Sequence, residues 1–342
     1  MDSFKPLYVA VRAVIILKQT LIMDIEMKNQ FIKSAVTEVN GSEDKASIRK
    51  RFAAIGLVLT VLVVSIQIFE AVLYAIVDRK APELWEKPWM SWIIVAAGFY
   101  LTAFPIYCFL MRKIPDAPKG EPKPMKAGDL ISLFFIGMAS LYIFNFVSLL
   151  INTGISSIKG SGVINPLTNA VNSSNVLYTF LFAGIIAPVI EEIIFRGILL
   201  DKVRGYGDKK AVWFTAIVFG LFHLNTSQLL YSIALGIIFA YVVLKTNRII
   251  YSVILHIAIN LMGSVAAPVL AGAGYYSALG TMIIAMIVIG SILFIIKSRR
   301  PAGNETVQPV SREPGNPVIY GNPGMILYIG LCTVLIIVMT VF

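Results

Sequence analysis

The sequence predicts an all-α protein, a polytopic transmembrane helical bundle of about eight core spans with an additional C-terminal span. Of its 342 residues, 57% are hydrophobic and 14% are charged, and the mean hydropathy is +0.80. Soluble domains carry about 25% charged residues, so this composition excludes an ordinary soluble protein. The apolar residues are also gathered in segments of roughly 20, the length that an α-helix needs to cross the hydrocarbon layer.

Nine apolar segments, bounded by charged residues, Pro or Gly, are expected to span the membrane. Six are clear, at about 52–77, 89–111, 128–151, 176–200, 275–297 and Met325–Phe342. Three more are shorter and closely spaced, at about 211–225, 228–245 and 249–269. The short ones predict a compact group of helices joined by tight turns.

Lysine and arginine are distributed unevenly between alternate connections. One side of the membrane receives 24 of them and the other receives 4. Because cytoplasmic loops carry the excess of basic residues, we expect the N-terminus in the cytoplasm and the C-terminus outside, in the plasma membrane of a prokaryote. The net charge of +10 follows from this asymmetry, so the expected partner is the lipid bilayer and no nucleic acid.

Four regions are expected along the chain. Residues 1–50 form a cytoplasmic amphipathic segment and linker, which lies on the inner membrane surface or binds a partner. Residues 51–175 hold the N-terminal spans and an external loop (152–175) that either covers a site or only connects two spans. Residues 176–297 form the core that carries the candidate site. Residues 298–342 form a Pro- and Gly-rich linker and the C-terminal span, which we interpret as an appendage.

Three ionisable residues fall within one apolar span, at Glu191, Glu192 and Arg196 in the string APVIEEIIFRGILL. An ionisable residue at mid-bilayer costs roughly 2.5–3.5 kcal/mol on insertion scales, so such residues are few and usually functional. Glu192 and Arg196 are four residues apart, which favours an ion pair on one helix face. Glu191 is rotated by about 100° from Glu192 and has no basic residue at that spacing. It is the unexplained carboxylate.

Both histidines of the chain also lie in apolar spans, His223 in AIVFGLFHLN and His256 in SVILHIAINLM. His256 shares a helix face with Asn260, and Phe219 shares one with His223, because each pair is four residues apart. In the topology above, Glu191, His223, His256 and Asn260 lie roughly 10–18 Å from the cytoplasmic ends of their helices. All four side chains could therefore meet in one buried site.

Such a set of side chains is suited to the hydrolysis of a peptide bond. A glutamate and a histidine can hold and deprotonate a water molecule. An imidazole N–H and an amide NH₂ on another helix can stabilise the developing oxyanion. This chemistry requires no serine or cysteine nucleophile.

At these residues the sequence resembles the CPBP family of intramembrane peptidases, which includes the CAAX prenyl endopeptidases and bacteriocin-processing or immunity proteins. Three motifs occur in order on three apolar spans: Glu191-Glu192-x-x-x-Arg196, Phe219-x-x-x-His223 and His256-x-x-x-Asn260. The resemblance covers about residues 176–270. It implies a helical bundle around a cavity open to the cytoplasm and inner leaflet, an endopeptidase activity and no cofactor.

The resemblance also assigns a role to each residue. Glu191 and His223 activate the water, and His256 and Asn260 serve the oxyanion. The supporting residues are Glu192, Arg196 and Phe219. The substrate is then a membrane-embedded or lipid-anchored peptide, either a CAAX-type C-terminus or a bacteriocin or leader peptide.

Three other functions stay open. Glu191, His223 and His256 could supply the three protein ligands of a catalytic zinc, although no H-E-x-x-H string is present; our expectation is a metal-independent, glutamate-type peptidase. The same polar residues could line an ion pathway in a transporter. The protein could also be an immunity protein that binds a toxic peptide without cutting it.

Overall fold

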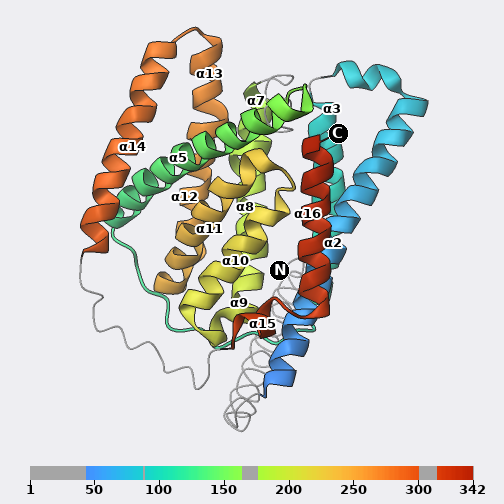
Figure 1. Ribbon diagram of the computed structural model, residues 1–342, viewed down its shortest axis with the longest axis vertical. Coiled ribbons are helices and arrows are strands. Elements are labelled where there is room, and N and C mark those ends of the chain that lie inside the picture. The colour runs from blue at the N-terminus through green and yellow to red at the C-terminus, as the bar shows by residue number, and fades with distance from the viewer. Residues whose placement is uncertain (1–43, 88, 164–175, 300–313, 342) are drawn as a thin grey trace, which may run out of the picture. The chain divides into compact units, whose positions relative to one another are not determined.

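The computed structural model describes residues 44–87, 89–163, 176–299 and 314–341 (Figure 1). Within these residues every regular element is helical, which confirms the predicted all-α class. The chain divides into two units, Met1–Ile48 and Arg49–Phe342, and the fold described below is that of the second. The predicted amphipathic segment precedes residue 44 and lies outside the described residues.

The helices follow one another in three groups. The first contains α2 (Lys45–Lys80), η1 (Pro82–Glu86), α3 (Met90–Ala96), η2 (Ala97–Ala103), α4 (Phe104–Met111) and α5 (Ala127–Lys159). The second contains α7 (Val176–Leu181), η3 (Phe182–Ile186), α8 (Ala187–Glu192), η4 (Ile193–Leu199), α9 (Leu200–Val203), η5 (Arg204–Tyr206), α10 (Asp208–Phe222) and α11 (Thr226–Thr246). The third contains α12 (Ile250–Asn260), η6 (Leu261–Ala266), α13 (Ala267–Gly272), α14 (Tyr276–Ser298), α15 (Asn316–Ile319) and α16 (Pro323–Val341).

In the described part of the chain, eight helices are long and apolar enough to cross a membrane. They correspond to eight of the nine predicted spans. The ninth, predicted at 211–225, is α10, whose 15 residues fall short of the roughly 20 that a crossing needs. Because α10 and α11 pack against each other as a hairpin, the chain returns to the side it left, and the alternation of the connections is unchanged.

The turn between α10 and α11 carries His223. Leu224 follows with a φ of 54°, in the left-handed region, and the side chain of Asn225 caps the start of α11. Asn152 of α5 forms hydrogen bonds with two hydroxyl groups in the first turn of α11. Non-helical backbone at membrane depth is tolerated where protein buries it or where it lines a water-filled cavity, and this turn lines both cavities described below.

Three π-helical segments, η2, η3 and η6, each end two residues before a proline. In η3 the N–H of Ala187 donates five residues back, to the carbonyl of Phe182. The next donor in that series would be Pro188, which has no N–H. The carbonyl of Ala183 is therefore left without its helical partner. Such single-turn π segments are frequent at functional sites.

The third long helix extends beyond the predicted span. α5 continues to Lys159 and ends at Gly160, whose φ is 76°, so the external loop expected from residue 152 begins about two turns later. The polar residues in this stretch fit a helix because Thr153 and Ser157 donate to carbonyls four residues back. Residues 164–175 lie outside the described residues.

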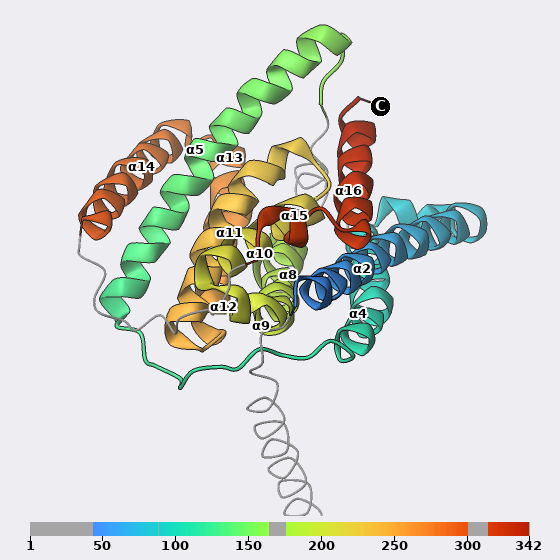
Figure 2. The ribbon, with the colours of Figure 1, turned by 60° about the horizontal axis from the view of Figure 1, so that its bottom comes forward.

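Helix α5 forms one wall of the bundle, with α14 on its outer side and α11 on its inner side (Figure 2). Leu133, Ile136 and Met138 of α5 pack with residues of α11 and α12 in a buried apolar cluster. Gly290 of α14 faces the backbone of Phe135, and a side chain there would clash with that carbonyl. Helix α14 is otherwise mostly exposed, which suits a lipid-facing helix.

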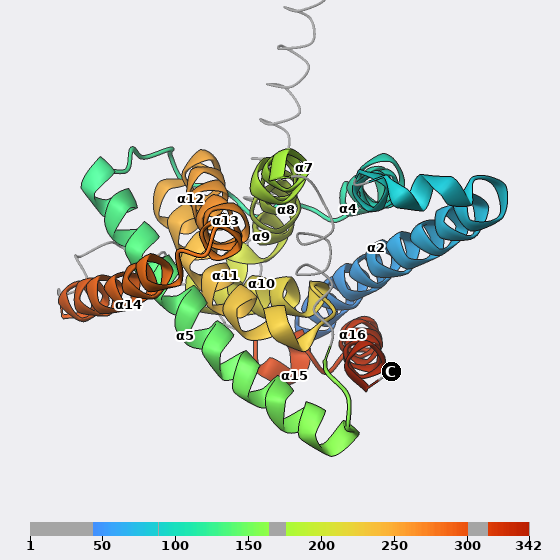
Figure 3. The ribbon, with the colours of Figure 1, turned by 90° about the horizontal axis from the view of Figure 1, so that it is seen from above.

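The C-terminal helix α16 is packed into the bundle and lies beside α2 (Figure 3). Gly324 meets the backbone of Ala53 so closely that a side chain would clash, and Tyr328 is fully buried and donates to the carbonyl of Val218 at 2.9 Å. This packing differs from our interpretation of the last span as an appendage. A polar linker before a span predicts that the span is independent of the others. Here contacts with residues far away in the sequence attach α16 to the bundle.

The connection between α4 and α5 is fastened to the ends of the core helices. Asp201 of α9 pairs with Lys119 at 2.5 Å, and Lys202 pairs with Asp116 at 2.6 Å. Backbone N–H groups of the same loop donate to the carbonyls of Asp201 and Thr246. These contacts hold the ends of α9 and α11 together beneath the site.

Candidate functional site

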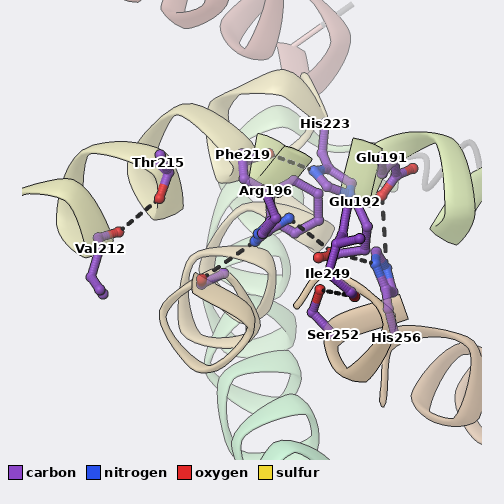
Figure 4. Close-up of polar contacts among 11 residues, drawn as sticks. Glu191, Glu192, Arg196, Val212, Thr215, Phe219, His223, Ile249, Ser252 and His256 are labelled. Carbon is purple, nitrogen blue, oxygen red and sulfur yellow. Dashed lines mark hydrogen bonds and ion pairs between the residues drawn. The ribbon is translucent and has the colours of Figure 1, made fainter. Parts of the chain in front are cut away.

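A buried carboxylate joins two of the three motifs (Figure 4). Oε1 of Glu192 lies 3.0 Å from Nη1 of Arg196 and 2.9 Å from Nδ1 of His256. The side chains of Glu192 and Arg196 are fully buried. The predicted ion pair is therefore confirmed, and it also has a third member, because Glu192 anchors the imidazole of His256 from another helix.

Aromatic rings enclose the guanidinium of Arg196. Its carbon lies 4.3 Å from the centroid of Phe219, 5.2 Å from that of Phe239 and 5.8 Å from that of Phe195. Nη2 donates to the carbonyl of Gly236 at 3.3 Å. A cation over aromatic faces is stabilised electrostatically when it is removed from water, so these rings replace part of the lost hydration of Arg196.

Phe219 contacts more of the site residues than the sequence indicated. Its ring meets His223 edge-on at 4.8 Å and His256 at 5.9 Å, besides lying under Arg196. Phe239, which the sequence analysis missed, stacks on His256 at 4.7 Å between centroids. An aromatic residue in an apolar helix carries no signal of its own, so Phe239 could be found only from the packing.

His223 is oriented by its own helix. Nδ1 lies 2.8 Å from the carbonyl of Phe219. A carbonyl oxygen can only accept, so Nδ1 donates, and Nε2 of the neutral ring is left as an acceptor. His223 follows the last residue of α10, and its ring lines the cavities at the point where the hairpin turns.

Asn260 is held by the carbonyl that Pro188 leaves without a helical partner. Nδ2 of Asn260 donates to the carbonyl of Ala183 at 3.0 Å. The amide NH₂ has two hydrogens, so this bond fixes the amide plane with one hydrogen still available. The link also joins η3 to the end of α12, and thus the first motif to the third.

Glu191 points away from the buried pair and toward open space. Its Oε2 lies 3.7 Å from Nε2 of His256, and its side chain is 16% exposed, whereas that of Glu192 is fully buried. The rotation of about 100° between neighbouring helix residues thus gives the two glutamates different environments. Glu191 is the carboxylate that a small molecule in the cavity can reach.

Two cavities meet at Glu191 and His223. The first, of about 370 Å³, lies against α2 and is bordered by Trp92, Phe99 and Tyr100. The second, of about 430 Å³, is lined by all four predicted catalytic residues, Glu191, His223, His256 and Asn260, and also by Asn145, Tyr231 and Ser264. The sequence did not indicate these additional polar residues, because uncharged polar side chains occur throughout these helices and none of the three belongs to a motif.

The positions of the acidic and histidine side chains also show which of them could bind a metal ion. Among the described residues, no group of three or more His, Cys, Asp or Glu side chains is arranged to hold a metal ion. Nδ1 of His256 is taken up by Glu192 and Nδ1 of His223 by a carbonyl. Each histidine therefore has only Nε2 to offer to a ligand in the cavity.

A comparison with known families finds one match. Residues 173–262 match the model of the family described as Type II CAAX prenyl endopeptidase Rce1-like. The matched segment, about a quarter of the chain, contains all seven predicted site residues and supports the CPBP/CAAX protease family. No curated protein and no solved structure matches the chain.

Proposed function

We propose that this protein is an intramembrane endopeptidase in which Glu191 and His223 activate a water molecule for attack on a peptide bond. The family match supports a CAAX-type intramembrane endopeptidase. One observation carries the mechanism further: Glu191, His223, His256 and Asn260, which come from three motifs far apart in the sequence, line the same cavity of about 430 Å³.

In this mechanism the water lies between Glu191 and Nε2 of His223. Glu191 takes one proton from the water as the water oxygen bonds to the peptide carbonyl carbon, while Nε2 of His223 accepts a hydrogen bond from the remaining O–H and orients the nucleophile. When the tetrahedral intermediate collapses, the C–N bond breaks and the proton passes from Glu191 to the leaving amine. The products are a carboxylic acid and an amine, and transfer of the acid's proton to the amine gives a carboxylate and an ammonium group.

His256 and Asn260 stabilise the oxyanion of this intermediate. Nδ1 of His256 donates to Glu192, so His256 must carry both protons to donate to an oxyanion through Nε2 as well. The second N–H of Asn260 is the other donor. Removal of one such donor typically costs 10²–10³-fold in kcat.

The substrate of this proposal is a peptide within or anchored to the membrane, since the site is roughly 10–18 Å from the helix ends. We place the N-terminus and the basic connections in the cytoplasm of a prokaryote. A prenylated C-terminus and a bacteriocin or leader peptide are the two substrate classes that the experiment below separates. The proposed reaction needs no metal.

The test is quantitative profiling of peptide N-termini in membranes from cells that express the wild type or Glu191→Gln at matched levels. New N-termini or C-termini found only with the wild type identify the substrate class. Identical profiles, in cells where the protein retains a measurable function, would point to a binding or transport protein. Loss of cleavage with a chelator, restored by Zn²⁺, would contradict metal independence.

A further inference from the structure

Glu70 of α2 is an ionisable residue within a membrane span that the proposed reaction does not use. It is partly buried, and it lines the cavity of about 370 Å³ that also contains Glu191 and His223. It belongs to none of the three sequence motifs. In the described residues no hydrogen bond or ion pair links its carboxylate to another side chain. An intramembrane acid without an internal partner is a candidate functional residue.

The position of the Glu70 side chain depends on a glycine in the neighbouring helical segment. A Cβ on Gly98 of η2 would lie 3.0 Å from Cγ of Glu70 and 3.7 Å from Cβ of Phe69. Gly98 thus leaves the space in which the Glu70 side chain lies between α2 and η2. Tyr100, two residues further on, borders the same cavity.

Among the Asp, Glu, Lys and Arg side chains, only acidic ones line this cavity. Its lining contains two carboxylates, from Glu70 and Glu191, and no lysine or arginine. Gln67, Asn225 and Gln228 contribute uncharged polar groups, and the other walls are mostly apolar. Charges that face a cavity with apolar walls interact more strongly than they do in water. The cavity therefore favours a cationic group.

We propose that Glu70 is the anchor of a subsite that receives a cationic group of the peptide substrate, a lysine or arginine side chain or an α-ammonium group. This inference rests on the proposed peptidase function. The two cavities meet at Glu191 and His223, so a peptide bond at that point has chain on both sides. The residues on one side occupy the cavity of Glu70, and the enzyme selects a basic group there.

The experiment uses the full-length protein in liposomes and internally quenched, lipid-anchored peptides that differ at one position near the scissile bond. The position holds Lys, Gln or Glu, and each peptide is made with a free and with an acetylated N-terminus. The variants are Glu70→Gln and Glu70→Lys. The matched control is Asp78→Asn, which removes an exposed carboxylate from the same helix outside the cavity.

The wild type and Asp78→Asn should cleave the Lys peptide with a kcat/KM about tenfold higher than the Gln peptide. Glu70→Gln should remove this preference, and Glu70→Lys should reverse it in favour of the Glu peptide. A preference that follows acetylation instead identifies the α-ammonium as the cation. A structural role alone would lower all rates together and leave the ratios unchanged.

Two failures are distinguishable. If the wild type cleaves peptides in a Glu191-dependent way but discriminates neither Lys from Gln nor a free from an acetylated N-terminus, or if Glu70→Gln keeps the discrimination, the subsite is refuted and the peptidase function stands. If no peptide of any charge is cleaved and Glu191→Gln changes nothing in the cellular profiles, the proposed function itself fails, and the subsite with it.

Discussion

Replacement of Arg196 by Met should destabilise the protein strongly, because it leaves the carboxylate of Glu192 buried without its cation. The two side chains lie 3.0 Å apart and are fully buried, and breaking such a pair from one side costs about 3–5 kcal/mol. His256 remains 2.9 Å from the same oxygen and offsets a part, so we expect the lower end, about 3 kcal/mol. The loss of the packing against Phe219 is small, since Met fills much of the same volume.

The assay is thermal unfolding of the purified protein in a fixed detergent, for Arg196→Met, Glu192→Gln and the double variant. Glu192→Gln leaves the buried guanidinium with neutral acceptors only, such as the carbonyl of Gly236, and should also destabilise because the compensating negative charge is lost. The double variant removes both charges and should be more stable than Arg196→Met, with a coupling free energy of about 1–3 kcal/mol. Activity should stay low in all three, because His256 loses its charged partner or its environment.

Additive losses in the double variant would refute this reasoning. Such a result would mean that the two side chains act through separate contacts, for example Arg196 only through the three aromatic rings. A double variant with wild-type activity would also contradict the role of Glu192 in holding the imidazole of His256 in place.

Three further changes test the surroundings of the site. Phe219→Leu should lower kcat by up to about 100-fold, because its ring packs against both histidines, while the protein still folds. Kinetics and thermal unfolding measured on one preparation will distinguish a loss of activity from a loss of stability. Pro188→Ala supplies the missing N–H and should compete with Asn260 for the freed carbonyl, so kcat should fall while the unfolding temperature stays or rises. Gly324→Val should cost about 1–3 kcal/mol or more, because a side chain there clashes with the backbone of Ala53, and a matched change at exposed Gly330 should cost far less.

The sequence was sufficient for the fold class because membrane spans are set mainly by local composition. The length and hydropathy of a segment decide whether it can cross, and α10 departs from the expectation for the same reason, being only 15 residues long. The packing of α16 could not be predicted this way. It depends on Gly324 meeting α2 and on Tyr328 meeting α10, contacts between residues far apart in the chain.

The candidate site was predictable to the extent that its residues stand out from their surroundings. Charged and histidine side chains are rare in apolar spans, so Glu191, His223 and His256 could be singled out from one sequence. Phe239 and Tyr231 could not, because aromatic residues are common in such helices. The bond between Asn260 and the carbonyl of Ala183 was equally hidden, since it depends on which helices are neighbours.

Under the proposed mechanism, the adjacent glutamates supply a fixed charge and a reactive one from a single helix. Glu192 faces the interior, where Arg196 and His256 share its Oε1, and it lines neither cavity. Glu191 faces both cavities, and its Oε2 lies 3.7 Å from Nε2 of His256. The pair therefore divides the work by orientation alone, because the two side chains differ in nothing but their position around the helix axis.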